Sequence, residues 1–506
     1  MAFDLSLPNV NTTATVAAGL VAAYCLVGVI YRLYFHPLAK FPGPRLAAAT
    51  LWYEFYYDCI LYGQYTFKIG RMHEKYGPII RISPNELHCN DPDFIPILYA
   101  GPGSRRDKSK FFCGAAAMPG ATAFTAGHDL HRMRRAQLSS FFSKASVRRL
   151  EPVIVKTVNK LTEALQTHKN SAKPVVLSSA YSGFAIDVIT DYCFAKSSNL
   201  LDDQTFQKSM HSAFSKARSG MHWIRHFPRL FDVLKWLPRP VALRINQGII
   251  ALQDLKTELR GQIGEIISQH ESGIKPDVES RATVIHDLLE SKMPAEEKAL
   301  DRLGIDVFTL IRAGTETMGS TLSLITYHLL SKPELLAILR KELETVFPDP
   351  ALMPPCTDLE QLPYLTGVIQ EGLRLAYGVS TRLQRADPDR PMQYKDWVIP
   401  PGTNTGMTSI LVHTNPEIFP EPYEFKPERW VENPKLDKYL LSFSKGSRIC
   451  VGIALAYEEL YLATAGVFRR MDMELYETDY SDVEIKYDNF TPKARLDSKG
   501  IRVIVN

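Results

Sequence analysis

The distribution of apolar residues sets residues 5–31 apart from the rest of the chain. No charged residue occurs from Leu5 to Tyr31, and the most apolar part, residues 12–31, is long enough to cross a bilayer once as a helix. Asp4 precedes this stretch and several basic residues follow it, so its C-terminal flank is expected on the cytosolic side. A cleaved signal peptide is the alternative, but such peptides begin with basic residues and have a shorter apolar core.

Beyond residue 40 the pattern predicts a mainly α fold with small β-sheets. Phe41-Pro-Gly-Pro44 is expected to be a stiff break, because proline fixes φ and lacks a donor. We therefore divide the chain into an anchor, residues 1–40, and one domain, residues 41–506. Helices are predicted up to Lys75, over residues 128–142, 301–330 and 359–375, and after Gly452; strands are predicted at Ile79–Ser83 with Glu86–Cys89, within residues 394–407, and as a terminal hairpin of residues 487–492 and 499–505.

A long irregular stretch, residues 101–127, interrupts the predicted elements. Loops of this length inside a domain are usually functional or mobile. Its aromatic residues Phe111, Phe112 and Phe124, together with Ala116, are candidates for the wall of a binding pocket. The alternative is a surface loop held down by buried apolar side chains.

Composition, net charge and cysteine pattern argue against several classes of protein. The chain has 506 residues, of which 45% are hydrophobic and 23% charged, so a large core can form. A net charge of +4 is too small to indicate a nucleic-acid partner, although it suits an anionic membrane surface. The seven cysteines are odd in number, scattered and without a CxxC pair, which argues against a disulfide framework or a zinc site and favours a reducing compartment.

The predicted helix over residues 301–330 is apolar on all sides and should be buried. Helical spacing places Thr309, Arg312, Ala313 and Thr317 on one face. Gly314 weakens the helix there by about 1 kcal/mol, so a threonine hydroxyl can bond a carbonyl or a ligand. A buried arginine needs a partner. Arg312 is therefore expected to meet a carboxylate or carbonyl of a substrate, or to pair with a carboxylate of the protein.

One cysteine near the C-terminus lies in a loop suited to binding a metal. Cys450 has a glycine on either side, Gly446 and Gly452, with Phe443 and Arg448 before it. A thiolate is the form of cysteine that ligates metals, and glycines let backbone N–H groups approach the sulfur. The helix that begins after Gly452 would favour the thiolate further. A structural cysteine beside a glycine-rich turn is the alternative, but five positions are specified at once.

This loop resembles the haem-thiolate signature of the cytochrome P450 monooxygenases. Three further motifs occur in the order of that family: the basic helix with His131 and Arg135, Ala313-Gly-Thr-Glu-Thr317, and Glu371-Gly-Leu-Arg374 with the downstream Arg429. The resemblance covers the chain after the hinge and implies the P450 fold around one haem b. The style of the sequence is similar to fungal microsomal members, particularly the trichodiene oxygenase group.

The resemblance also implies a role for each matching residue. Cys450 would bind the haem iron, while Thr317 and Glu316 would relay protons during oxygen activation. Glu371, Arg374 and Arg429 would lock the core on the haem side. The remaining cofactor positions would be His131, Arg135, Arg385 and Arg448 at the propionates, and Phe443, Gly446 and Gly452 around the ligand. The substrate positions would be Phe111, Phe112, Phe124, Arg312, Ala313, Val379, Ser380, Phe490 and Thr491.

The implied activity is insertion of one oxygen atom from O2 into a hydrophobic small molecule, by hydroxylation or epoxidation. The expected substrate is a terpenoid or polyketide intermediate of fungal secondary metabolism. Electrons would come from NADPH through a membrane reductase that docks on basic residues such as Arg132, Arg134 and Lys445, with cytochrome b5 as a candidate second donor. The enzyme would be a monomer in the endoplasmic reticulum membrane, with its catalytic domain on the cytosolic side. The alternatives are a haem-thiolate isomerase or dehydratase without a reductase, and a non-enzymatic haem sensor.

A second contact with the membrane is expected between Thr205 and Arg244. Aromatic and basic residues alternate there, as at a membrane interface. An ordinary helical segment with buried aromatic rings and a solvated basic face is the alternative. The residues concerned are Trp223, Phe227, Phe231 and Trp236 with Arg225, Arg229, Lys235 and Arg239.

Overall fold

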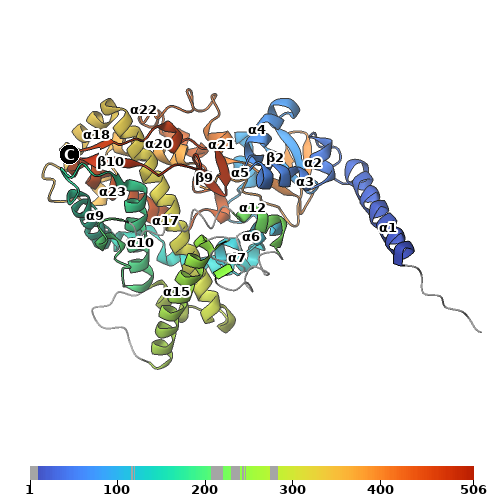
Figure 1. The fold of residues 1–506 in the computed structure, drawn as a ribbon, viewed down its shortest axis with the longest axis horizontal. Coiled ribbons are helices and arrows are strands. Elements are labelled where there is room, and N and C mark those ends of the chain that lie inside the picture. Colours follow the sequence, from blue (N-terminus) through green and yellow to red (C-terminus); the bar gives the residue numbers. More distant parts are fainter. Residues whose placement is uncertain are drawn as a thin grey trace, which may run out of the picture.

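Helix α1 (Val10–Ile30) projects from the remainder of the molecule and is exposed along its length (Figure 1). The structure is a computed structural model that describes residues 10–115, 118, 120–206, 220–228, 240–241, 244, 247–273 and 283–506. Together with the π-helical turn η1 (Tyr31–Phe35), α1 provides a segment, Thr13–Phe35, that is long and apolar enough to cross a membrane. The N-terminal apolar stretch is thus a helix, as predicted.

The proline- and glycine-containing segment after α1 is fastened to the first sheet. The Arg81 N–H donates to the Pro42 carbonyl at 2.7 Å, and Leu38 and Phe41 are buried. Gly43 has φ +153°, and a Cβ at this position would overlap the Arg81 carbonyl. The break between helix and domain is therefore held against β1 (Ile79–Ser83).

Helices make up most of the domain. The predicted helix up to Lys75 is divided into short pieces, whereas the other predicted helices form close to their expected limits. The α-helices after α1 are α2 (Arg45–Ala49), α3 (Trp52–Phe55), α4 (Tyr65–Tyr76), α5 (Ile95–Leu98), α6 (Lys110–Ala115), α7 (His128–Phe141), α8 (Lys144–Arg148), α9 (Glu151–Gln166), α10 (Leu177–Phe194), α12 (Met221–His226), α15 (Gln247–Glu271), α16 (Val284–Glu290), α17 (Leu300–Ser331), α18 (Pro333–Val346), α19 (Cys356–Leu359), α20 (Pro363–Ala376), α21 (Ser409–His413), α22 (Glu428–Glu432) and α23 (Ile453–Arg470).

Single π-helical and 3₁₀ turns connect some of these helices. They are η2 (Tyr56–Ile60), η3 (Pro92–Phe94), η4 (Thr122–Phe124), η5 (Leu200–Asp202), η6 (Ala295–Lys298), η7 (Pro434–Tyr439), η8 (Gly446–Arg448) and η9 (Tyr480–Asp482).

The strands form small sheets at the edge of the helical body. The predicted terminal hairpin is wrong, because residues 487–493 pair with one another whereas the last strand joins a different sheet. The sheets are β1 with β2 (Glu86–Cys89) and β6 (Asn404–Gly406); β3 (Val175–Val176) with β10 (Arg502–Val505) and β7 (Met473–Leu475); β4 (Met392–Tyr394) with β5 (Trp397–Ile399); and β8 (Tyr487–Asn489) with β9 (Thr491–Lys493).

Helix α17 runs through the centre of the body and organises its main hydrophobic core (Figure 1). Its side chains are apolar around most of the circumference, as expected of a helix that is covered by protein on several sides. Helix α10 packs along α17 closely enough that a Cβ on Gly319 would overlap the Ser182 hydroxyl. Helix α23, which begins directly after the cysteine loop, packs on the same core.

A buried carboxylate joins α20 to α22. Glu371 has no exposed side-chain surface and accepts two hydrogen bonds from Arg374, at 2.8 and 2.7 Å. Arg429 and Trp430 add donors at 3.0 and 2.9 Å. Both oxygens of this carboxylate are therefore hydrogen-bonded, and the network ties α20 to α22.

We expect Glu371→Gln to destabilise the fold strongly. The amide removes the negative charge and leaves two guanidinium groups around a neutral side chain, so the free energy of unfolding should fall by about 3–5 kcal/mol. Urea unfolding of the full chain in detergent measures this change. Glu432→Gln, an exposed glutamate on α22, is the matched control and should unfold like the wild type. Equal stability of the two variants would show that the buried carboxylate is not structural.

Candidate active site

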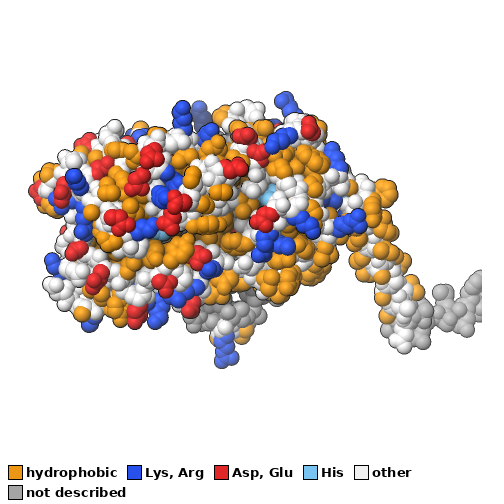
Figure 2. Space-filling model, turned by 90° about the horizontal axis from the view of Figure 1, so that it is seen from above, with side chains coloured by type: hydrophobic (Ala, Val, Ile, Leu, Met, Phe, Trp, Pro, Cys, Tyr) orange, Lys and Arg blue, Asp and Glu red, His pale blue; other side chains and the backbone are white. Residues whose placement is uncertain are grey.

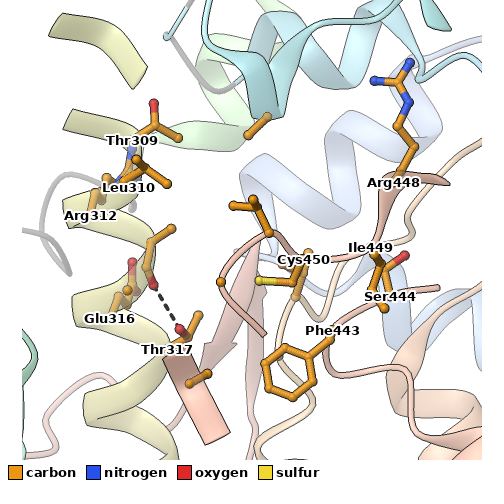
Figure 3. A pocket seen from close by; sticks show the side chains of 18 of the residues that line it. Thr309, Leu310, Arg312, Glu316, Thr317, Phe443, Ser444, Arg448, Ile449 and Cys450 are labelled. Carbon is orange, nitrogen blue, oxygen red and sulfur yellow. Dashed lines mark hydrogen bonds between the residues drawn. The ribbon is translucent and has the colours of Figure 1, made fainter. Parts of the chain in front are cut away.

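The loop before α23 presents Cys450 to an internal cavity. The Cys450 N–H donates to the Phe443 carbonyl at 2.9 Å, which closes the loop on itself. The sulfur points toward α17, and Thr317 and Glu316 lie across the intervening space (Figure 3). The cavity has a volume of about 340 Å³. The Cys450 side chain is thus accessible to a ligand inside the protein although surrounded by protein groups.

Opposing effects act on the Cys450 thiol. Burial raises its pKa, whereas the Gly452 N–H, which donates to the sulfur, and the positive charges of Arg135 and Lys108 lower it. The first turn of α23 starts at Ile453, so the positive end of that helix also lies beside the sulfur. The surroundings are therefore prepared to hold a thiolate once a metal compensates the cost of burial.

The two glycines of the loop differ in what they make possible. The N–H of Gly452 reaches the sulfur. Gly446 has φ +71°, and a Cβ there would overlap the Tyr99 and Ala100 carbonyls. Gly446 therefore permits close packing of the loop on the segment after α5, and unlike Gly452 it does not line the cavity. Phe443 lines the cavity and contacts Tyr457 with ring centroids 5.4 Å apart.

Positive charge gathers on the same side of the cavity as Cys450. Lys108, Arg135, Arg385 and Arg448 line it, and none of them pairs with a carboxylate of the described residues. Burial and the neighbouring Arg385 lower the pKa of Lys108 to about 7. Burial, with Arg385 again, lowers the pKa of Arg448 to about 10. These shifts reflect burial and the mutual repulsion of the positive charges, which the Asp107 carboxylate offsets in part for Arg448.

Neutral groups of the protein hold these cations in place. Arg448 donates to the Arg106, Thr125 and Ala126 carbonyls at 3.2, 2.7 and 2.8 Å. Arg135 donates to the Ile449 carbonyl, and Arg385 to the Ser444 hydroxyl at 3.2 Å.

His131 lies among the same cations and is uncharged near neutral pH. Burial, with the charge of Arg448 next in size, lowers its pKa to about 2. The ring can therefore offer one N–H donor to the cavity without adding to its charge.

This arrangement fits haem. A cysteine sulfur faces the cavity, and nearby cations without carboxylate partners suit the two negatively charged propionates. The expected positions Arg135, Arg385, Arg448 and His131 all line the cavity. Sequence reasoning missed Lys108, which lies in the irregular stretch 101–127 and donates to the Ala123 carbonyl at 2.7 Å. The sequence distinguishes Lys108 only by its positive charge and by its position in a segment that is expected to face a ligand.

Helix α17 forms the opposite wall. Thr309, Arg312, Ala313 and Thr317 all line the cavity, in agreement with their shared helical face. The Thr317 hydroxyl donates to the Ala313 carbonyl at 2.9 Å. The helix nevertheless stays α-helical through Gly314. Glu316 is buried and accepts a hydrogen bond from the Thr491 hydroxyl at 3.2 Å, which links α17 to the hairpin of β8 and β9.

An aromatic cluster closes part of the cavity. Phe490, at the turn between β8 and β9, stacks on Phe112 with centroids 5.7 Å apart and contacts Phe124 at 6.2 Å. Its φ of +76° is unusual for a residue with a side chain, and it directs the ring toward these partners. Thr491 and Val379 line the cavity as well.

Two expected substrate residues lie elsewhere. Phe111 packs against His226 and Arg225 of α12, with centroid distances of 5.6 and 5.7 Å, because successive residues of α6 face different directions. Ser380 is fully buried, and its hydroxyl donates to Asp488 at 2.8 Å, so it positions the β8–β9 hairpin. Ala116 falls outside the described residues, as do Phe231, Trp236, Arg229, Lys235 and Arg239 of the expected second membrane contact.

A second group of potential metal ligands does not resemble a haem site. Cys356, Glu360 and Glu458 lie together, but none of them lines the cavity. Arg148 donates to Glu360 and Glu458 at 2.8 and 3.0 Å, so the charge of these carboxylates is already compensated.

Comparison with known proteins identifies the family. The sequence model described as Cytochrome P450 matches residues 52–496. The chain is 42% identical to the cytochrome P450 monooxygenase sdnE of Sordaria araneosa, covering 96% of this chain and 97% of that protein. It is 40% identical to the tryptophan 6-hydroxylase fscE of Fusarium equiseti (99% of both chains) and 38% identical to the N-acetyltryptophan 6-hydroxylase ivoC of Emericella nidulans (96% and 95%). The chain therefore belongs to the cytochrome P450 family, as a haem-thiolate monooxygenase that takes electrons from NADPH through a reductase.

Proposed function

We propose that this enzyme inserts one oxygen atom from O2 into a terpenoid or polyketide intermediate of fungal secondary metabolism, by hydroxylation or epoxidation. The observation that carries the proposal is the position of Cys450 opposite Thr317 and Glu316, across a cavity with an aromatic wall. Two relatives are named for hydroxylation of tryptophan and N-acetyltryptophan, which are compact molecules with an apolar ring. They support a substrate of modest size with an apolar ring for this cavity as well.

In this proposal, groups around Cys450 hold the cofactor. Cys450 would ligate the iron of haem b, and Lys108, His131, Arg135, Arg385 and Arg448 would bind its propionates, since none of these five forms an ion pair with a carboxylate of the described residues. Haem supplies the activation of O2 when it is bound. Phe443 shields the sulfur from water, and the Gly452 N–H stabilises its negative charge.

The residues of α17 manage protons. The Thr317 hydroxyl donates to the Ala313 carbonyl. When a ligand in the cavity offers an acceptor, the hydroxyl can rotate and donate to the ligand instead. Glu316 lies next to it on the helix and accepts from Thr491, so its carboxylate is held at the cavity wall. The Glu316 carboxylate and the Thr317 hydroxyl can together transfer a proton into the cavity. Phe112, Phe124, Phe490 and Val379 exclude water from the apolar side.

The apolar N-terminal helix and the surface beside it support a location on a membrane. We propose residues 1–40 as the anchor in the endoplasmic reticulum and residues 41–506 as the cytosolic catalytic domain, because basic residues follow the apolar stretch. Exposed apolar side chains next to the projecting helix support this position (Figure 2). They include Leu46, Leu51, Trp52, Tyr56, Ile60 and Trp223. Trp223 contacts Phe55 at 5.4 Å, so α12 shares this surface.

We propose that a monomer receives its electrons on the Cys450 side, from the reductase and from cytochrome b5. Arg132 is exposed on α7 and can meet an acidic partner. Lys445 is half-buried, and its ammonium group donates to the Asp437 carbonyl at 3.1 Å. Arg134 does not suit this role, because it forms a bidentate ion pair with Glu297 at 2.6 and 2.8 Å and is largely buried.

The ligand assignment is tested by the absorption spectrum of the reduced protein under carbon monoxide. We expect the strongly red-shifted Soret band of thiolate-ligated haem in the wild type and its absence in Cys450→Ser, because a hydroxyl does not replace the thiolate. Cys356→Ser is the matched control and should keep the band. A band that survives in Cys450→Ser and is lost in Cys356→Ser would overturn the assignment.

The proton-relay role is tested by Thr317→Ala. Product formation should fall about a hundredfold, because the hydroxyl assists proton transfer, while NADPH oxidation should fall less because electron delivery does not require it. Thr315→Ala is the control: its hydroxyl donates to the Ile311 carbonyl, and it does not line the cavity. Product and NADPH are measured side by side. Equal losses of both in Thr317→Ala would instead indicate damage to cofactor or reductase binding.

The role of Lys108 is tested by haem retention. Lys108→Met should speed transfer of haem to an acceptor apoprotein about tenfold, because a charge-assisted hydrogen bond to a propionate is lost. Since the pKa of Lys108 is about 7 before an anion binds, haem binding above pH 7 must take up a proton. The haem affinity of the wild type should therefore fall as the pH rises above 7, and the variant should lack this component. Lys110→Met, exposed on the same segment, should behave like the wild type.

A further inference from the structure

We propose that Arg312 binds the carboxylate of the substrate, so that the enzyme acts on an amphipathic acid: an apolar body with a carboxylate remote from the oxidised carbon. This inference rests on the proposed function and specifies the substrate class of the same cavity. Arg312 lies on α17 and lines the cavity, one turn before Glu316 (Figure 3).

No protein anion neutralises Arg312 in the described part of the chain. Its one recorded polar contact there is with the Met221 sulfur of α12, at 3.9 Å, which is a weak acceptor. Burial lowers the pKa of Arg312, and no charged neighbour contributes to the shift. Burying a guanidinium without a partner is costly, so the side chain is prepared for an anion from outside the chain.

The carboxylates closest to Arg312 along α17 are already engaged. Asp306 forms an ion pair with Arg302 at 2.8 Å and accepts from the Thr122 N–H and hydroxyl at 2.6 and 2.8 Å. Glu316, one turn after Arg312, accepts from Thr491 and forms no ion pair with Arg312. Neither acid therefore forms an ion pair with Arg312.

Arg312 is also separate from the cations assigned to the propionates. Lys108, Arg385, Arg448 and Arg135 shift one another's pKa values or that of His131, whereas none of them affects Arg312. They come from the Cys450 side of the cavity, and Arg312 comes from the opposite wall. An anion at Arg312 would thus be a second one, in addition to the haem propionates.

The surroundings of Arg312 define the ligand further. A guanidinium presents a planar fork of donors that matches a carboxylate. Thr317 lies five residue steps after Arg312, a rise of about 7.5 Å along the helix axis. Leu310, Ala313 and Met221 provide apolar surface beside it. A substrate held at both places would therefore have its carboxylate several bonds away from the carbon that faces Cys450.

A series of imidazoles tests this inference in the holoenzyme without knowledge of the natural substrate. We would titrate ω-(imidazol-1-yl)alkanoic acids of increasing chain length, each beside the alcohol of equal length, and follow the spectral change of nitrogen ligation to haem. The imidazole gives the same signal in every probe, so the ratio of acid to alcohol affinity isolates the effect of the carboxylate.

We expect the wild type to bind the acid at least about tenfold more tightly than the alcohol at one favoured length, because charge-assisted hydrogen bonds are strong. Arg312→Leu should bring this ratio to about one, and Arg312→Lys should keep part of it because the charge remains. Arg71→Leu, which removes an exposed charge on α4, should leave it unchanged. Arg312→Gln provides the same comparison if the leucine variant loses haem.

A wild type without acid preference at any length, or a preference that survives in both Arg312→Leu and Arg312→Gln, would overturn the inference. The carbon monoxide spectrum distinguishes this failure from that of the proposed function. If the red-shifted band is present, only the role of Arg312 is refuted. If the band and the nitrogen-ligation signal are both absent in the wild type, the haem assignment fails and the inference falls with it.

Discussion

Positive charge without carboxylate partners is the constraint on which the cavity depends. Arg135, Arg385, Arg448 and Lys108 surround one side of it, and they are held by carbonyls and a hydroxyl, which orient a cation but do not neutralise it. Such a cluster is unfavourable in a low-dielectric interior unless an anion enters. Any dianion bound here relieves this repulsion, so cofactor binding and the stability of the surrounding loops are linked.

The same protein buries other arginines in the opposite way. Arg374 is fully buried and paired with Glu371, and Arg382 donates to Glu54 and Glu86 at 2.6 and 2.7 Å. These guanidinium groups lie within packed protein, where a lost partner could not be replaced. The chain thus neutralises Arg374 and Arg382 itself, whereas Arg385 and Arg312, which line the cavity, form no ion pair with a carboxylate of the described residues. This distinction separates Arg374 from Arg385 and Arg312 although all three are largely enclosed.

Sequence patterns were sufficient for the parts of the structure that depend on local order. The apolar run of α17, the cysteine loop and the hairpin of β1 and β2 are each determined by neighbouring residues, and each forms where the pattern predicts it. The last strands were mispaired because β10 joins β3 and β7, which are distant in sequence. The direction of Phe111 depends on α12, and the access of Lys108 to the cavity depends on how residues 101–127 cross it. Such contacts are set by tertiary packing, which periodicity does not describe.

The two walls of the cavity differ in how firmly their polar groups are held. The Cys450 side is rigid, since Gly446 packs against carbonyls of residues 99 and 100 and Arg448 is held by three more. The opposite wall contains groups with exchangeable partners: the Thr317 hydroxyl uses a carbonyl of its own helix, and Arg312 uses a thioether. Weak partners of this kind are displaced at little cost by a better acceptor. The Cys450 side can therefore hold the haem in place while residues of α17 exchange their hydrogen-bond partners for groups of a bound ligand. In this chain, Arg312 adds a positive charge to the α17 wall.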